Sequence, residues 1–167
     1  MKNILSIFLL LLALNSSAQK FAYVDSEYIL ERIPEYQSAQ DQLEKVSVTW
    51  QDEIEQVFQE IDQLYKKFQA DQILLTQDMK KKRENEIINK EKQAKELQRK
   101  RFGPNGDLFT KRKELVQPIQ DRVFNAIKSF SEEKRYDFIF DKSSDLIMLH
   151  SNPSLDKSDD ILKILGN

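Results

Sequence analysis

The sequence predicts an α+β fold that is mostly α, with a small strand-containing body and one long antiparallel coiled-coil hairpin. Of its 167 residues, 32% are charged, whereas only three are Gly and four are Pro. This composition favours long helices over a turn-rich fold. Short apolar runs suited to strands stand at both ends of the helical region. Because the chain has no Cys, packing alone must hold the helices together.

The N-terminal segment MKNILSIFLLLLALNSSAQK has the three-part layout of a secretory signal. One basic residue precedes a strongly apolar run over residues 4–14, which is shorter than the roughly 20 residues that a transmembrane helix needs. The small residues Ser16 and Ala18 predict cleavage between Ala18 and Gln19. We therefore expect residues 1–18 to be a signal peptide and the mature protein to be exported, with an uncleaved membrane anchor as the alternative.

A coiled-coil seam dominates the first half of the chain. From Tyr36 onward, apolar residues recur at spacings of 3 and 4, as the a and d positions of a coiled coil do. Such a seam must meet a partner, which we expect to be the downstream helical segment with a similar repeat from Val116 to Phe130. Between Met79 and Phe102 the seam is thin. The seam residues of the first arm are Ala39, Leu43, Val46, Trp50, Ile54, Val57, Ile61, Leu64 and Phe68, and those of the returning arm are Ile87, Ala94, Leu97, Val116, Ile119, Val123, Ile127 and Phe130.

Two segments could form the turn of this hairpin. The segment from Phe102 to Asp107 contains Gly-Pro-Asn-Gly and is the stronger helix breaker. A turn there would leave about 50 residues of seam without a partner, at 1.5 Å each. We therefore place the tip near residues 72–78, where Thr76 can cap a new helix, and expect Gly103–Asp107 and Pro118 to interrupt the returning arm.

The expected domains follow from this placement. Residues 19–34 form the first part of the body, residues 35–134 form the hairpin, and residues 135–167 complete the body. In the body, we expect a strand at Phe21–Asp25, a helix capped by Ser26 and a bend at Pro34. Asp137–Asp141 and Leu146–His150 are expected to form a β-hairpin around Lys142–Asp145, and Asp156–Leu165 a helix that ends at Gly166.

The charges are distributed unevenly. Residues 26–63 carry ten acidic and two basic side chains, whereas residues 64–113 carry fifteen basic and seven acidic ones. In a hairpin with its tip near residue 75, acidic residues 41–62 lie beside basic residues 88–109. Most of the basic run is therefore expected to complement the acidic arm, in pairs worth a few tenths of a kcal/mol each. The tip alone keeps an unmatched positive excess.

The residues needed for catalysis are missing. His150 is the only histidine, so neither a Ser-His-Asp arrangement nor a histidine-based metal site has its parts. With two of the three glycines in Gly103-Pro104-Asn105-Gly106, no Gly-rich phosphate loop precedes a helix. We expect no enzymatic activity, no cofactor and no metal.

The tip combines basic and apolar side chains. The basic ones suggest nucleic acid or anionic lipid, but export disfavours nucleic acid and a pI of about 5.6 argues against general polyanion binding. The apolar ones form either a cap that seals the hairpin or a deformable surface that holds unfolded chains. These candidate residues are Lys66, Lys67, Phe68, Ile73, Leu74, Leu75, Met79, Lys80, Lys81 and Lys82.

The order of elements resembles that of the periplasmic Skp/OmpH chaperone family: signal peptide, strand, helical hairpin, two strands and a terminal helix. The resemblance covers the whole mature chain. Its most specific pieces are FAYVDSEYILERIPEY near the start and YDFIFDKSSDLIMLHSNPSLDKSDDILKILG near the end.

This resemblance implies a homotrimer in the periplasm, whose strand bodies form one base while the hairpins surround a cavity. It also implies that unfolded outer-membrane proteins are held there without nucleotide. On this interpretation the trimer body is built by Phe21, Tyr23, Phe138, Phe140, Leu146 and Met148. The alternatives are a structural coiled-coil spacer of the cell envelope and a module that binds an anionic membrane surface through the basic tip.

Overall fold

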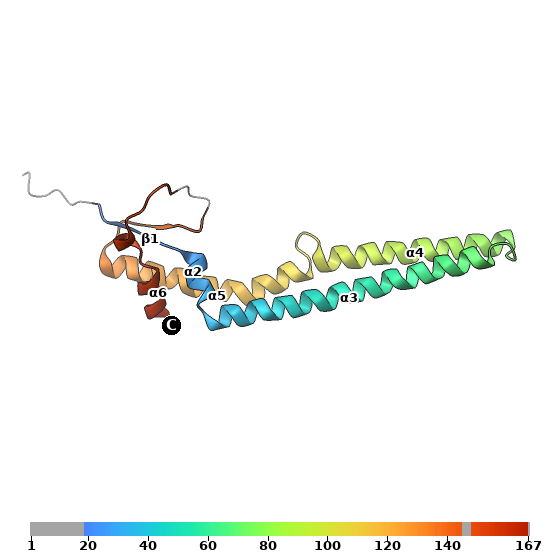
Figure 1. The fold of residues 1–167 in the computed structure, drawn as a ribbon, viewed down its shortest axis with the longest axis horizontal. Coiled ribbons are helices and arrows are strands. Elements are labelled where there is room, and N and C mark those ends of the chain that lie inside the picture. The colour runs from blue at the N-terminus through green and yellow to red at the C-terminus, as the bar shows by residue number, and fades with distance from the viewer. Residues whose placement is uncertain (1–18, 145–147, 167) are drawn as a thin grey trace, which may run out of the picture. The chain divides into compact units, whose positions relative to one another are not determined.

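The structure is a computed structural model that describes residues 19–144 and 148–166 (Figure 1). The expected signal peptide and Leu146 lie outside the described residues. Contacts divide the chain into two compact units. The hairpin unit is Ile33–Asp121, and the terminal unit combines residues 19–32 with residues 122–166. Thus the last part of the returning arm, which the sequence assigned to the hairpin, belongs with the strands.

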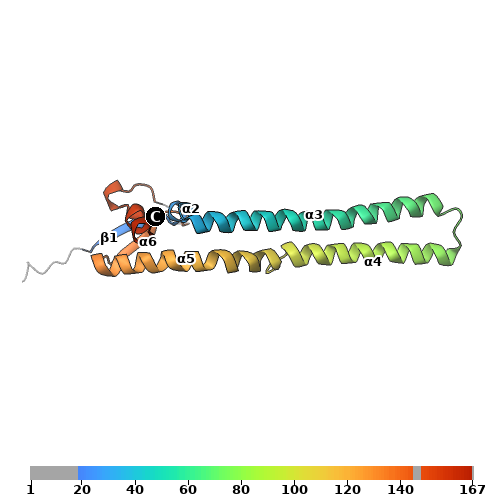
Figure 2. The ribbon, with the colours of Figure 1, turned by 90° about the horizontal axis from the view of Figure 1, so that it is seen from below.

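Three helices build the hairpin unit. They are α3 (Pro34–Asp71), α4 (Gln77–Phe102) and α5 (Asp107–Lys134), of which residues up to Asp121 belong to this unit. Helix α3 runs antiparallel to α4 and then to the first part of α5, as both ribbon views show (Figures 1 and 2). The expected fold class, mostly α with a long helical hairpin and a small sheet, is confirmed.

Local signals set the ends of these helices. Pro34 begins α3, where its missing N–H costs no hydrogen bond. Residues 72–76 join α3 to α4, and the Leu74 N–H donates to the Asp71 carbonyl at 2.9 Å. The Thr76 hydroxyl then accepts from the Met79 N–H and caps α4, with Asp78 in the positive first turn.

The apolar seam is the core of the hairpin. On α3 its members are buried or half-buried, and on α4 the buried members are Ile87 and Ala94. Ile61, Ile87 and Ala94 form one cluster, against which Phe68 packs. Because α4 is otherwise polar, few side chains on it bury apolar area, and the outer part of the seam is thin, as its sequence predicts.

Charge complementarity between the arms accounts for part of the basic run. The Lys90 Nζ lies 3.1 Å from Glu60 Oε2, and Arg101 pairs with Glu53 at 3.0 Å. Other pairs form within a single helix instead, such as Lys66 with Asp62. The expectation that acidic α3 residues face basic α4 residues is therefore confirmed at these positions, but some lysines near the tip are matched by their own helix.

The interruption between α4 and α5 is tightly bonded. Arg101 donates to both carboxylate oxygens of Glu53 on α3 and, at 2.7 Å, to Asp107 at the start of α5. Its guanidinium also lies 4.7 Å from the centroid of the Trp50 ring, which meets Phe102 edge to face. One side chain thus connects all three helices of the unit at the point where the returning arm is broken.

Two glycines make this break compact. A Cβ on Gly103 would lie 2.3 Å from the Arg99 carbonyl oxygen, and a Cβ on Gly106 would lie 2.7 Å from the Lys100 carbonyl oxygen. Asn105 adopts a left-handed conformation, with φ of 59°, which asparagine tolerates better than most residues. Pro118, in contrast, lies exposed inside α5 without ending it, so the expected interruption there is wrong. On an exposed face, water can bind the carbonyl that loses its helical partner.

A two-stranded parallel sheet forms the centre of the terminal unit. Strand β1 (Phe21–Val24) pairs with β2 (Phe138–Asp141), so that Phe21 is opposite Phe138 and Tyr23 is opposite Phe140. Helix α2 (Ser26–Glu31), the short 3₁₀ helix η2 (Pro153–Leu155) and helix α6 (Ser158–Leu165) complete the unit. Its buried apolar side chains are Ala22, Tyr23, Val24, Ile29, Val123, Ala126, Phe130, Ile161 and Leu162.

Two expectations for this unit are wrong. Met148–His150, the described part of the expected second strand, is not a strand, and among the described residues β2 pairs with β1. After β2 the chain turns at Lys142–Ser144, where Asp141 accepts from the Ser143 N–H and hydroxyl. In addition, Asp25 caps α2 by accepting from the Tyr28 N–H, whereas Ser26 is its first residue.

Within the described residues, no helix combines the length and the apolar character needed to cross a membrane. This finding covers α3, α4 and α5, the long helices, which carry charges throughout their length.

We expect Gly103→Ala to lower the free energy of unfolding by about 1–2 kcal/mol. The added Cβ would overlap the Arg99 carbonyl, which is backbone at the end of α4 and cannot move without disturbing the helix. Urea titration followed by helical circular dichroism measures the change as a lower midpoint. Pro104→Ala is the control, because Pro104 is exposed. Equal midpoints for the two variants would show that the break is loose.

Candidate functional site

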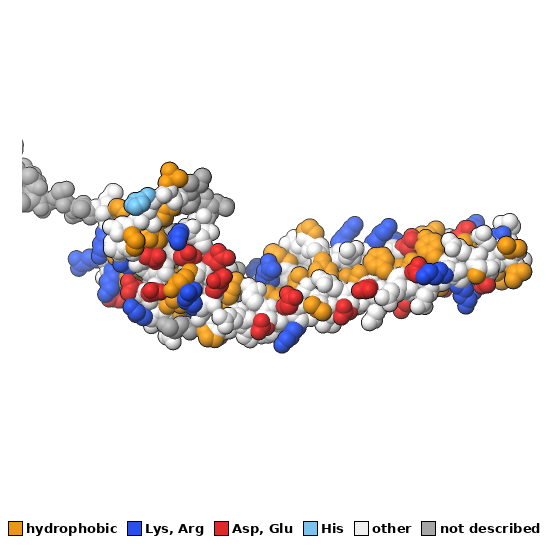
Figure 3. Space-filling model, in the orientation of Figure 1, with side chains coloured by type: hydrophobic (Ala, Val, Ile, Leu, Met, Phe, Trp, Pro, Cys, Tyr) orange, Lys and Arg blue, Asp and Glu red, His pale blue; other side chains and the backbone are white. Residues whose placement is uncertain are grey.

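The outer end of the hairpin exposes large apolar side chains. Ile73 is 88% exposed and Leu74 is 85% exposed, and half of Met79 is accessible to solvent. Leu75 is half-buried. Figure 3 shows hydrophobic side chains at the surface of this end of the hairpin, between charged ones. We call residues 73–82 together with Lys66 and Lys67 the tip surface.

The ten sequence-predicted tip residues do not all point to solvent. Phe68 packs against the Ile61, Ile87 and Ala94 cluster and is part of the seam. Lys66, Lys67, Lys81 and Lys82 are exposed, and Lys80 is half-buried. Because Ile73 and Leu74 are almost fully exposed, they bury little apolar area within the hairpin, whereas Phe68 packs in the seam and Leu75 is half-buried.

A second apolar surface lies on the small sheet. Phe138 and Phe140 project from the same side of β2 with their rings stacked 6.2 Å apart, and both are exposed. Phe21, opposite Phe138 on β1, is 52% exposed. Among the described residues, β2 pairs with a strand on one edge only. We call Phe21, Phe138 and Phe140 the phenylalanine face.

The remaining predicted body residues are less exposed. Tyr23 is opposite Phe140 and so lies on the same side of the sheet, but it is buried, and the segment around Asp156 runs beside it. Met148 is half-buried. The structure therefore brings together three of the six predicted body residues on one exposed surface, while Leu146 lies outside the described residues.

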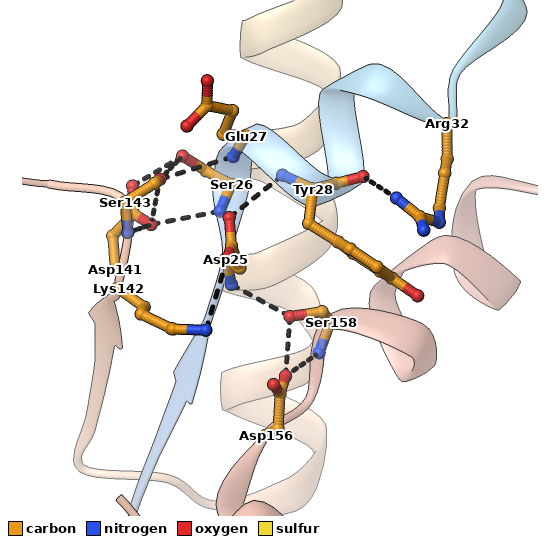
Figure 4. Close-up of polar contacts among 10 residues, drawn as sticks. All are labelled: Asp25, Ser26, Glu27, Tyr28, Arg32, Asp141, Lys142, Ser143, Asp156 and Ser158. Carbon is orange, nitrogen blue, oxygen red and sulfur yellow. Dashed lines mark hydrogen bonds and ion pairs between the residues drawn. The ribbon is translucent and has the colours of Figure 1, made fainter. Parts of the chain in front are cut away.

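Asp141 holds the phenylalanine face in place from the end of β2. Its carboxylate accepts from the N–H and hydroxyl of Ser26, at 3.1 and 2.6 Å, and from the N–H and hydroxyl of Ser143 (Figure 4). Burial raises the pKa of this carboxyl, but the four hydrogen bonds outweigh burial and lower it below the ordinary value of aspartate. The charged form of Asp141 thus joins β2 to the start of α2.

A second network joins β1 to α6. The Asp25 N–H donates to the hydroxyl of Ser158, a buried serine, and that hydroxyl donates to Asp156 at 2.6 Å (Figure 4). The Tyr28 hydroxyl donates to Asp159, and this hydrogen bond raises the tyrosine pKa. These polar contacts fix the C-terminal helix against the strands; in the described part of the chain, His, Asp and Glu side chains form no group of three that could hold a metal ion.

Sequence reasoning missed an apolar edge on the hairpin. Phe58 and Tyr65 are both exposed, although each stands beside a buried seam residue. Their spacing of seven residues, shared with Gln51, was the signal that could have revealed them, because residues seven apart lie on the same side of a helix. The bonding of Arg101 was also missed, since its two partners are 48 and 6 residues away.

One protein family matches most of the chain. A family model for outer membrane proteins of the OmpH-like type matches residues 20–165. The crystal structure of an OmpH-like protein from Caulobacter crescentus CB15, to which the role of outer membrane chaperone is attributed, is similar to this chain with a TM-score of 0.71. That match covers 90% of this chain and 86% of the other at 12% identity, and therefore shows a shared fold. A comparison with curated proteins finds no match.

We expect Asp141→Asn to destabilise the terminal unit by about 1 kcal/mol at pH 7, because an amide replaces a hydrogen-bonded carboxylate at a partly exposed position. The folded-state pKa of Asp141 is lowered, so its contribution is present above the ordinary aspartate pKa and is lost as the pH falls through the folded value. Urea unfolding of wild type and variant at pH 7 and at about pH 2.5 measures this.

Glu132→Gln is the matched control, because Glu132 is an exposed residue of α5 whose ion pair with Lys128 spans one helical turn. We expect a change of a few tenths of a kcal/mol at pH 7 for this variant. A stability difference between wild type and Asp141→Asn that is the same at both pH values would contradict the role of the Asp141 charge.

Proposed function

Because the chain belongs to the OmpH-like outer membrane protein family, we propose that it is an ATP-independent holding chaperone of the periplasm. It binds unfolded outer-membrane proteins and prevents their aggregation. The observation that carries this proposal is the tip surface, where Ile73 and Leu74 are almost fully exposed beside lysines. Exposed large apolar side chains on a soluble surface are typical of interaction sites.

A holding chaperone needs many weak contacts rather than one deep pocket. Each apolar side chain buried by a client contributes on the order of 1 kcal/mol, and several together retain a chain without fixing its conformation. The tip surface suits this task, since its leucines, isoleucine and methionine are adaptable in shape. Its lysines favour clients with acidic segments and reach them through flexible stems.

We also propose that three copies assemble through the phenylalanine face. Phe21, Phe138 and Phe140 are exposed on a sheet of two strands, and such a sheet is too small to be stable without further packing. The edge of β2 that pairs with no described strand can accept a strand from another copy. Assembly would bury these rings and place several hairpins around one base, which the resemblance to Skp/OmpH chaperones also implies.

One pair of measurements tests the function as a whole. Light scattering gives the mass of the protein in solution, and dilution of a urea-unfolded outer-membrane barrel into buffer with and without the protein measures aggregation. We expect a trimer that keeps the barrel soluble. A monomer that leaves aggregation unchanged would refute the chaperone function and favour the structural spacer.

We expect Leu74→Ser together with Leu75→Ser to weaken holding and to leave the mass of the assembly unchanged. Loss of two leucine contacts, at about 1 kcal/mol each, should raise the concentration needed to halve aggregation by roughly ten- to thirtyfold. The barrel-dilution assay measures this, and replacement of Lys80, Lys81 and Lys82 by Gln in a second variant separates the apolar from the cationic contribution. Undiminished holding by the leucine variant would move the client surface away from the tip.

We expect Phe138→Ser together with Phe140→Ser to convert the trimer into monomers, because both rings would be buried between copies. Light scattering at several protein concentrations measures the mass. Phe124→Ser is the control, since Phe124 is exposed on α5 of the same unit and lies outside the phenylalanine face. Trimers of unchanged stability in the double variant would place the assembly surface elsewhere.

A further inference from the structure

The two sides of the hairpin seam differ in chemistry. On α3, Ile54 and Ile61 are buried, and residues 53 and 60 flank them on one side while residues 51, 58 and 65 flank them on the other. The first side carries the interhelical ion pairs of Glu53 and Glu60. The second side carries Gln51, Phe58 and Tyr65. The Tyr65 hydroxyl donates to Glu91 of α4 at 2.9 Å, and Phe58 and Tyr65 remain about 40% exposed.

A groove lies on this second side, between α3 and α4. It has a volume of about 400 Å³ and is lined by Gln51, Ile54, Glu55, Phe58, Gln98 and Phe102. Ile54 is buried, and the Phe102 ring is held by its edge-to-face contact with Trp50. The Arg101 contacts on the other side of the seam fix the end of α4. The groove therefore has an apolar floor and aromatic sides on rigid elements.

We propose that this aromatic groove binds an extended apolar segment of an unfolded polypeptide, and specifically a strand of a transmembrane β-barrel before it folds. This inference rests on the proposed function and names a contact surface for it in addition to the tip. The chemistry of the groove selects this occupant. Phe58 and Phe102 pack against apolar side chains, while the amides of Gln51 and Gln98 can donate to and accept from the peptide groups of an extended chain.

The size and the charge of the groove are compatible with this occupant. On α3 the groove runs from Gln51 to Phe58, seven positions or about 10 Å along a helix, which an extended chain covers with about three residues. Strands of membrane barrels are about 9–11 residues long and present apolar side chains at every second position. Glu55 is the one charged residue among the six that line the groove, so the groove is not built for a charged ligand.

Site-specific photo-crosslinking tests the proposal. A photoreactive side chain replaces Gln51 at the groove or, as the matched control, Gln56, which is also an exposed glutamine of α3 but does not line the groove. The full-length protein is mixed with a urea-unfolded outer-membrane barrel on dilution. We expect at least fivefold more crosslinked barrel from position 51 than from position 56. Equal yields from the two positions would overturn the proposal.

A second measurement uses Phe58→Ser in the barrel-dilution and crosslinking assays. Phe58 is an exposed side chain, so its replacement leaves the helical content unchanged, and Phe109→Ser on α5 is the control of equal chemistry and similar exposure. We expect Phe58→Ser to reduce crosslinking from position 51 at least threefold and Phe109→Ser to leave it unchanged. Equal crosslinking yields from the two variants would also contradict client binding at the groove.

The failure of the groove and the failure of the proposed function give different results. If wild type keeps the barrel soluble but position 51 does not react, the groove is wrong and the chaperone function stands. If wild type leaves aggregation unchanged, both the proposed chaperone function and the proposed binding of clients at the groove are wrong.

Discussion

The structure depends on the burial of one apolar seam between antiparallel helices. In a chain with 32% charged residues and few turn residues, side chains such as Leu43, Ile54 and Ile61 can leave water only by meeting another helix. A single seam buries one stripe along each helix and leaves the rest of the helix surface in solvent. Stability and a large accessible surface therefore arise from the same pattern, and that surface is what a protein that holds other chains requires.

The Arg101 contacts decide how the returning arm tolerates a break in the middle of this seam. The Gly103 to Gly106 loop interrupts the backbone hydrogen bonds of the arm, and an unrestrained loop would let α4 move independently of α5. Arg101 prevents this by bonding Glu53 and Asp107 together, with Trp50 beneath it. Because a guanidinium presents a rigid fork of donors, it can hold two carboxylates in fixed directions, which a lysine cannot do. The glycines of this loop thus provide close packing rather than flexibility.

Much of the fold could be predicted from the sequence, because periodic patterns encode local structure. The seam from Ala39 to Phe68 predicted the first arm, and Thr76 predicted the start of α4. Interactions between distant residues could not be predicted in this way. The parallel pairing of β1 with β2 brings together segments more than one hundred residues apart, and so does the hydrogen bond of Ser26 to Asp141. At the tip, composition identified the exposed leucine and isoleucine. The sequence alone could not decide whether Phe68 belongs to the seam or to the exposed tip, because this follows only from its packing against the cluster that contains Ile87.

The tip surface and the aromatic groove share one physical property, which is that their apolar side chains are exposed without cost to the fold. Ile73 and Leu74 lie in a short turn whose ends are fixed by Asp71 and by the Thr76 cap. Phe58 stands beside a seam that is already closed by Ile54 and Ile61. In both places the backbone is supported by contacts that these side chains do not make. Their exposure is therefore compatible with a stable protein, and the free energy of burying them becomes available when another chain covers them.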